Sequence, residues 1–192
     1  MIFALSLAAA TATADIGLKS YSLGSSIDSF KEQSLPAGKY GPVRPMCSDM
    51  PEHKTWLAPA LPESVACSFE QQIGSSWVRD DLGLSPEVSA TVSFHYFAGK
   101  LAMIESYLDE TRSSIVGESL VTRFGKPTSV STKPVQVRSG ASFPQTTTVW
   151  VLGSKTVTMK VPDLTLERMS VTYIDTPAVA QANSLHKRAN IM

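Results

Sequence analysis

The sequence TVSFHYFAGKLAMIESYLDETRSSIVGESLVTRFGKP occupies residues 91–127 and contains the clearest structural pattern of the chain. Val92, Phe94 and Tyr96 recur at every second position, and a period of two is typical of a β-strand. The alternation resumes after Gly99, which tolerates the positive φ of a tight turn, so we expect a β-hairpin. Because Ala98 disfavours a type I′ turn, the sequence favours a type I turn with Gly99 as the left-handed bulge residue.

The residues after this hairpin predict an amphipathic helix. Asp109 or Thr111 can accept hydrogen bonds from its first free amides. Gly125 suits a left-handed C-cap, and Pro127 cannot continue the helix. The helix would dock on the hairpin through an apolar stripe that recurs every four residues and is widened by one more side chain: Val116, Leu120, Phe124 and Val121.

The rest of the chain predicts more strands than helices. Residues 15–23 resemble an opening strand, and Ser25 or Ser26 can cap a short helix after it. Pro134 interrupts an alternating run and predicts an edge strand or a bulge. Residues 36–62 contain six prolines and little regular pattern. We therefore expect an α+β fold, with an antiparallel sheet, one or two helices packed on one of its faces, and a division into two β-α-β-β halves.

The length of the chain and its net charge indicate its domain organisation and exclude some classes of binding partner. The 192 residues predict a single domain over residues 15–176, divisible at residue 90, followed by a flexible tail or loose helix over residues 177–192. Seventeen acidic and 17 basic side chains give zero net charge, which argues against a nucleic-acid partner. No run of about 18 apolar residues follows the N-terminus, so no transmembrane segment is expected in the mature chain.

The N-terminus and the cysteines indicate export. Residues 1–14 form an apolar run that ends in Ala-Thr-Ala, which is typical of a signal peptide, although a first buried strand or helix has the same composition. Cys47 and Cys67 make an even count, so in an oxidising compartment we expect them to form a disulfide; the alternative is two reduced, buried thiols. The expected location is periplasmic or secreted.

No motif for catalysis, a cofactor or a metal stands out. His53, His95 and His186 are scattered, and the chain has no nucleophile elbow, phosphate loop, dinucleotide fingerprint or paired-histidine motif. The segment from Cys47 to His53 offers thiolate, carboxylate and imidazole groups, but a disulfide would remove the thiolate. We therefore expect no catalytic, cofactor-binding or metal-binding residue. Three tryptophans form a candidate binding surface, with the core or its rim as the alternative: Trp56, Trp77 and Trp150.

Several short stretches resemble a known superfamily. They are GL at residues 17–18, LGSSI at 23–27, FAGKL at 97–101, FGKP at 124–127 and VW at 149–150. Together they resemble the exported bacterial superfamily that holds the beta-lactamase inhibitor protein and the small outer-membrane assembly lipoproteins. The resemblance implies a non-enzymatic envelope protein that binds another protein through its sheet. The chain departs from that pattern because it has no lipobox cysteine and carries a proline-rich insertion with a cysteine pair, so no functional residue is carried over.

Two functions follow from these observations. The first is an exported protein-binding or inhibitor-like protein without catalytic activity, whose partner is another envelope or secreted protein contacted by a sheet face or an edge strand. The alternative is a small periplasmic hydrolase or ligand-binding protein with a site near the Cys47–Cys67 loop. A broad, flat surface would favour the first, and a concave pocket with clustered titratable groups the second.

Overall fold

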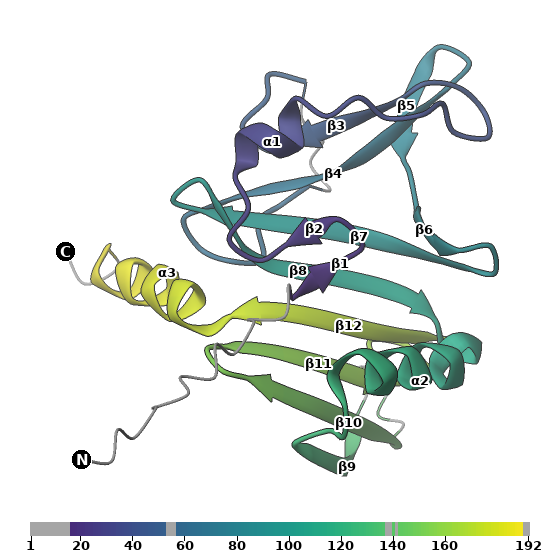
Figure 1. Cartoon of the computed structure of the whole chain (residues 1–192), viewed down its shortest axis with the longest axis vertical. Helices are drawn as coiled ribbons and strands as arrows, with labels where there is room; N and C mark the ends of the chain where they lie inside the picture. The colour runs from purple at the N-terminus through teal and green to yellow at the C-terminus, as the bar shows by residue number, and fades with distance from the viewer. Residues whose placement is uncertain (1–15, 53–56, 137–139, 141, 190–192) are drawn as a thin grey trace, which may run out of the picture.

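The computed structural model describes residues 16–52, 57–136, 140 and 142–189, so the expected signal segment lies outside the described residues. One ten-stranded antiparallel sheet dominates the molecule (Figure 1). The expected α+β class is wrong, because the protein is mostly β, with 50% strand and 20% helix. The physical reason is that long segments with a period of two follow one another through tight turns, whereas the α-helices contain only 5, 12 and 14 residues.

The elements follow in chain order. The strands are β1 (Gly17–Leu18), β2 (Tyr21–Ser22), β3 (Val43–Cys47), β4 (Ser64–Ile73), β5 (Ser76–Arg79), β6 (Leu82–Ser85), β7 (Val88–Phe97), β8 (Lys100–Asp109), β9 (Ser129–Gln136), β10 (Ser142–Leu152), β11 (Lys155–Val161) and β12 (Arg168–Asp175). The helices are α1 (Ile27–Lys31), the 3-10 turn η1 (Glu110–Arg112), α2 (Ser113–Phe124) and α3 (Thr176–Ala189).

The strand order divides the chain into two similar units. The main path of the sheet is β3-β4-β7-β8-β12-β11-β10-β9, with β5 on β4 and β6 on β7. The first half of this path is β3, β4, β7 and β8, and it follows helix α1 in the sequence. The second half is β9, β10, β11 and β12, and it follows helix α2. The two halves join where β8 pairs with β12, the last strand of each half. The boundary therefore lies after Asp109 rather than at residue 90, because the β7–β8 hairpin pairs with β4 of the first unit.

The central hairpin is present, but its turn differs from the prediction. Ala98 and Gly99 have φ values of 49° and 74°, as a type I′ turn requires. The expected type I turn is therefore wrong, and the bulge of this strand pair lies between His95 and Tyr96. A type I′ turn matches the right-handed twist of the two ten-residue strands, and this pairing outweighs the preference of Ala98.

The first unit is organised around an aromatic cluster. Ser26 caps α1, because its hydroxyl accepts a hydrogen bond from the Asp28 amide at 3.2 Å, which confirms one of the two predicted caps. Phe30 is the buried residue of this helix, and its ring lies 5.1 Å from the rings of both Phe69 and Phe94. A five-residue helix is not stable on its own, so its packing on the sheet must hold it in place. The contacts between these rings contribute stability beyond the burial of their apolar area.

The second unit packs α2 on the same face of the sheet (Figure 1). Leu120 is 5% exposed and belongs to the core that contains Phe94. The helix ends at Gly125 as predicted, but with φ 77° and ψ −161°, which is a positive-φ conformation outside the left-handed helical region. Val121 is 46% exposed, so the apolar stripe is narrower than predicted. A Cβ on Gly117 would lie 3.6 Å from the terminal methyl of Met159, which is an ordinary van der Waals contact, so the approach of the helix to the sheet does not require a glycine here.

The opposite face is covered only in part. The residues expected to form a flexible tail or loose helix form α3, whose Ala182 is fully buried against Phe97 and Met103. Residues around Met46 and Leu57 make a second small cluster on this face. β9 lies at the end of the sheet, which confirms the edge position predicted from its proline.

Tyr173 should make stability depend on pH in the alkaline range. Its ring lies in the core beneath α2, 6.5 Å from the Phe124 ring, and burial raises the pKa of Tyr173 to about 12. An unfolded tyrosine loses its proton near pH 10, so between pH 10 and 12 the folded state holds a proton that the unfolded state has lost. The contribution of Tyr173 to the free energy of unfolding is therefore fully present below pH 10 and decreases as the pH rises from 10 to 12.

We therefore expect Tyr173→Phe to flatten this dependence. Between pH 8 and 11 the free energy of unfolding should fall by about 1.4 kcal/mol less in the variant than in the unmodified protein. Urea titrations at the two pH values measure the difference, and the other tyrosines cancel because both proteins contain them. Identical losses in the two proteins would contradict the assignment.

Candidate functional site

The predicted disulfide is present. Cys47 and Cys67 lie directly opposite each other on β3 and β4, are fully buried, and are joined by an S–S bond of 2.04 Å. Neither sulfur remains a thiolate for a metal. Among the described residues, no group of three His, Cys, Asp or Glu side chains is placed to hold a metal ion, and His53 lies outside those residues.

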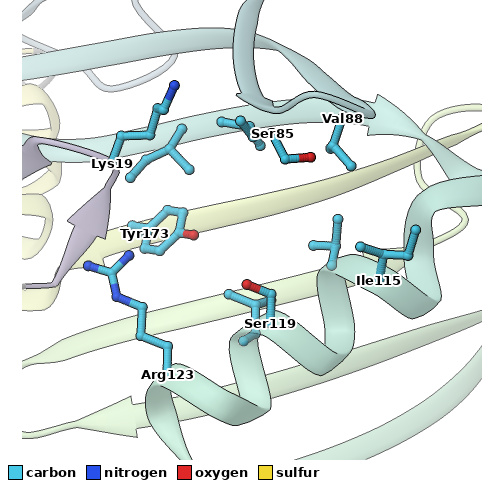
Figure 2. A pocket seen from close by; sticks show the side chains of 11 residues that line it. Lys19, Ser85, Val88, Ile115, Ser119, Arg123 and Tyr173 are labelled. Atoms are coloured by element: carbon cyan, nitrogen blue, oxygen red, sulfur yellow. The ribbon is translucent and has the colours of Figure 1, made fainter.

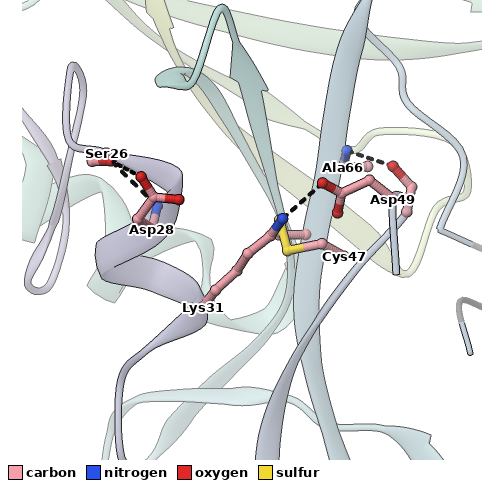
Figure 3. Close-up of a disulfide and its surroundings, with 8 residues drawn as sticks. Ser26, Asp28, Lys31, Cys47, Asp49 and Ala66 are labelled. Atoms are coloured by element: carbon pink, nitrogen blue, oxygen red, sulfur yellow. Dashed lines mark hydrogen bonds and ion pairs between the residues drawn. A yellow bond between two sulfur atoms is a disulfide. The ribbon is translucent and has the colours of Figure 1, made fainter. Parts of the chain in front are cut away.

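Polar groups around the disulfide hold the loop rather than an open site (Figure 3). Lys31 of α1 donates to the Asp49 carboxylate at 2.7 Å. Ser48 accepts a hydrogen bond from the Ala66 amide through its hydroxyl at 3.0 Å and donates its own amide to the Ala66 carbonyl at 2.8 Å. These hydrogen bonds give the polar residues after Cys47 a structural role in holding the loop. They do not favour a catalytic or ligand-binding site near the Cys47–Cys67 loop.

The three tryptophans do not share one surface. Trp150 is 1% exposed, and its indole N–H donates to the Gly125 carbonyl at 2.9 Å, so it belongs to the core. Trp77 is half-buried, and the Arg44 guanidinium lies 4.1 Å from its ring centroid. Trp56 lies outside the described residues.

His95 contacts a carboxylate on the neighbouring strand rather than a candidate nucleophile. It is 1% exposed, and its Nε2 lies 3.1 Å from the Glu105 carboxylate. Ser93 lies two residues earlier on the same face of β7, but its hydroxyl accepts from Arg79 at 2.7 Å and shares no hydrogen bond with His95. His186 lies on α3, far along the chain. This arrangement does not provide the geometry of an activated hydroxyl.

Alternation gives the second unit one buried face. Ile104, Tyr173, Val157 and Trp150 lie opposite one another across β8, β12, β11 and β10. None of them is more than 3% exposed, because α2 covers this row. This face of the four strands forms the core under α2.

The other face of the same strands carries a row of half-buried, mostly polar side chains. Glu105, Thr172, Thr158 and Val149 lie opposite one another in the same strand order. With the neighbouring rows they make a surface that no described helix covers, which we call the open sheet face. Its residues are Glu105, Tyr107, Thr147, Val149, Val151, Thr156, Thr158, Lys160 and Thr172.

Two features border the open sheet face. On one side α3 packs on Met103 and Ile174 of the same face. On the other side the β11–β12 loop is held by Asp163, whose carboxylate accepts from the Ser170 hydroxyl at 2.6 Å. The centre consists of threonines and valines, so it offers methyl groups and hydroxyls without a central charge. Such a surface suits contact with another flat surface and lacks a concave reaction site.

Sequence reasoning noted the alternation but did not assign its two sides. Threonines at 156, 158 and 172 flank the buried Val157 and Tyr173, which is the apolar-in, polar-out pattern of a sheet with one uncovered face. That signal could have located the open sheet face once the row beneath α2 was known.

Comparison with protein-family models, with curated proteins and with solved structures finds no match for this chain. In the part of the chain that the structure describes, no helix is both long enough and apolar enough to cross a membrane.

Proposed function

We propose that this chain is an exported protein that binds another envelope or secreted protein through the open sheet face and has no catalytic role. One observation carries the proposal. The same four strands bury one row to 3% exposure or less, while the row that alternates with it is half-buried and is covered by no described helix. A sheet whose second face is uncovered over several strands is available for a partner of matching flatness.

The size of the open sheet face suits a small protein contact. Its four strands, β8, β12, β11 and β10, lie about 4.8 Å apart, and three rows of outward side chains lie about 6.8 Å apart along each strand. The resulting area of about 400 Å² is about half of the 800 Å² or so that each partner contributes to a standard interface, so the contact would lie at the small end of protein interfaces. Because the centre is uncharged, the matching surface should carry neutral apolar and hydroxyl side chains rather than a charged cluster.

Two further observations support export and the kind of partner. The disulfide suits an oxidising compartment, where the partner would also lie. The superfamily that the sequence resembles implies contact through the sheet.

Thr158→Arg should strongly weaken partner binding. A long charged side chain at the centre of the open sheet face would separate the surfaces and lose its hydration on binding. The wild-type protein should retain a stoichiometric protein from a cell-envelope extract of the source organism. With that protein purified, Thr158→Arg should weaken Kd by at least about 100-fold, measured by titration calorimetry.

The matched control is Thr122→Arg, which makes the same change at an exposed position of α2. Its Kd should stay within about twofold, and both variants should keep the wild-type melting temperature within a few degrees. The proposal fails if no stoichiometric protein is retained, or if Thr158→Arg binds as tightly as the control.

A further inference from the structure

The covered face of the sheet contains a groove of about 240 Å³ beside α2 (Figure 2). Ile115, Ser119 and Arg123 of α2 line one side of it. Lys19 after β1 and the β6–β7 turn line the other. The floor is β12 of the sheet, so the walls come from three parts of the chain that are distant in sequence.

The hydroxyl of Tyr173 is directed into this groove (Figure 2). The residue is 3% exposed, and no described side chain or backbone group forms a hydrogen bond with its hydroxyl. The hydroxyl is not among the buried polar atoms without a partner in the described part of the chain, so it reaches the open space of the groove. Burial also raises the pKa of Tyr173, so the hydroxyl keeps its proton at neutral pH and can donate. The missing partner is what the polar group of a ligand would supply.

Two cations lie at one end of the groove. Lys19 donates to the Gly83 carbonyl, and Arg123 donates to the Gly17 carbonyl at 2.8 Å, so backbone groups fix both side chains near the mouth. The charge of Arg123 lowers the pKa of Tyr173 and so acts against the effect of burial, which means that guanidinium and phenol lie close together. Among the described residues, no acidic side chain lines the groove.

The remaining walls are mainly apolar, with two serines, Ser85 and Ser119, among them. Leu84 and Val88 lie on the side of the β6–β7 turn, and Ile115 and Leu120 lie on α2. The groove thus combines a cationic end, the hydroxyl of Tyr173, two serines and a largely hydrocarbon lining. Pockets for drug-sized ligands measure about 300–1,000 Å³, so an occupant of this groove must be smaller.

We propose that this groove binds a small amphipathic anion, with its acidic group at Lys19 and Arg123, a hydrogen bond to Tyr173, and its hydrocarbon part against α2. A medium-chain or aromatic carboxylate has this chemistry. The groove lies on the opposite side of the sheet from the open sheet face, so the proposal stands independently of the protein-binding function.

Titration calorimetry with three probes of equal chain length tests the proposal on the full chain. Octanoate should bind with a Kd of about 0.1–1 mM, octanol at least about tenfold more weakly, and octylamine more weakly still. Equal binding of octanoate and octanol would overturn the proposal. So would no octanoate binding up to about 5 mM, which is the result expected if another segment of the chain already fills the groove.

Variants locate the site. Ser119→Trp should fill the groove and abolish octanoate binding, whereas Val121→Trp, on the exposed side of the same helix, should leave it unchanged. Arg123→Gln should weaken octanoate binding by about tenfold and octanol binding little. Binding that survives Ser119→Trp would place the ligand elsewhere and overturn the proposal.

Tyr173→Phe separates a binding role from a structural one. Octanoate should bind about fivefold more weakly, while the melting temperature at neutral pH should stay the same or rise, because the lost hydroxyl has no described partner in the free protein. A lower melting temperature with unchanged affinity would assign the hydroxyl to the fold and overturn its role in the groove.

Discussion

Leu120→Asp should unfold the second unit at temperatures at which the unmodified protein is stable. Leu120 is the buried residue of α2 and is 5% exposed, so the change removes its apolar contacts and places a carboxylate in the core. Leu-to-Ala changes in cores already cost about 2–5 kcal/mol, and the buried charge adds to that. Because native proteins are stable by about 5–15 kcal/mol, most of the margin is lost.

The neighbouring residue provides a strict control for this change. Val121→Asp puts the same charge on the same turn of α2, but Val121 is 46% exposed, so the cost should stay below about 1 kcal/mol. Thermal unfolding followed by circular dichroism compares the two variants. If both melt at the same temperature, α2 is not held on the sheet through Leu120.

Local signals in the sequence predicted local structure well. The hairpin around Gly99, the Ser26 cap, the end of α2 at Gly125 and the edge position of β9 are confirmed. Each depends on residues within a few positions of one another, where φ preferences, capping groups and the missing amide of proline decide the outcome. The disulfide was predictable for another reason, since the chain has only two cysteines.

The fold class was not predictable from the same signals. It depends on the pairing of β8 with β12, in which Ser106 lies opposite Val171 and donates its hydroxyl to the Val171 carbonyl across 65 residues. No local pattern specifies such a pair. The same holds for the groove, because Lys19, Arg123 and Tyr173 come from distant parts of the chain. Trp150 illustrates the same difficulty for a single residue. The alternating pattern predicts that its side chain points to one side of the sheet, but it does not predict that α2 covers that side.

The two faces of the sheet give the molecule two separate surfaces. Thr172 belongs to the open sheet face, and the next residue, Tyr173, forms the floor of the groove under α2. Adjacent strand residues point to opposite sides, so a substitution can affect one surface and leave the other intact. Thr158→Arg and Ser119→Trp use this separation, because each blocks one surface only.

Replacing both cysteines by alanine should lower the free energy of unfolding by about 3 kcal/mol, the value expected when a cross-link over about 20 residues no longer restricts the unfolded chain. β3 is an edge strand whose ladder partner is β4, so without the bond its pairing depends on the hydrogen bonds of five residues. Urea titrations at neutral pH give the difference.

Reduction supplies the control for this double change. A reductant should bring the unmodified protein to the same stability as the double variant and leave the variant unchanged, because only the disulfide distinguishes them. Since both cysteines are 0% exposed, the reductant should act only after the bond is exposed by unfolding, so the loss should develop at the unfolding rate. A double variant as stable as the unmodified protein would mean that packing of Cys47 and Cys67 against the core, rather than the covalent bond between them, holds β3 on the sheet.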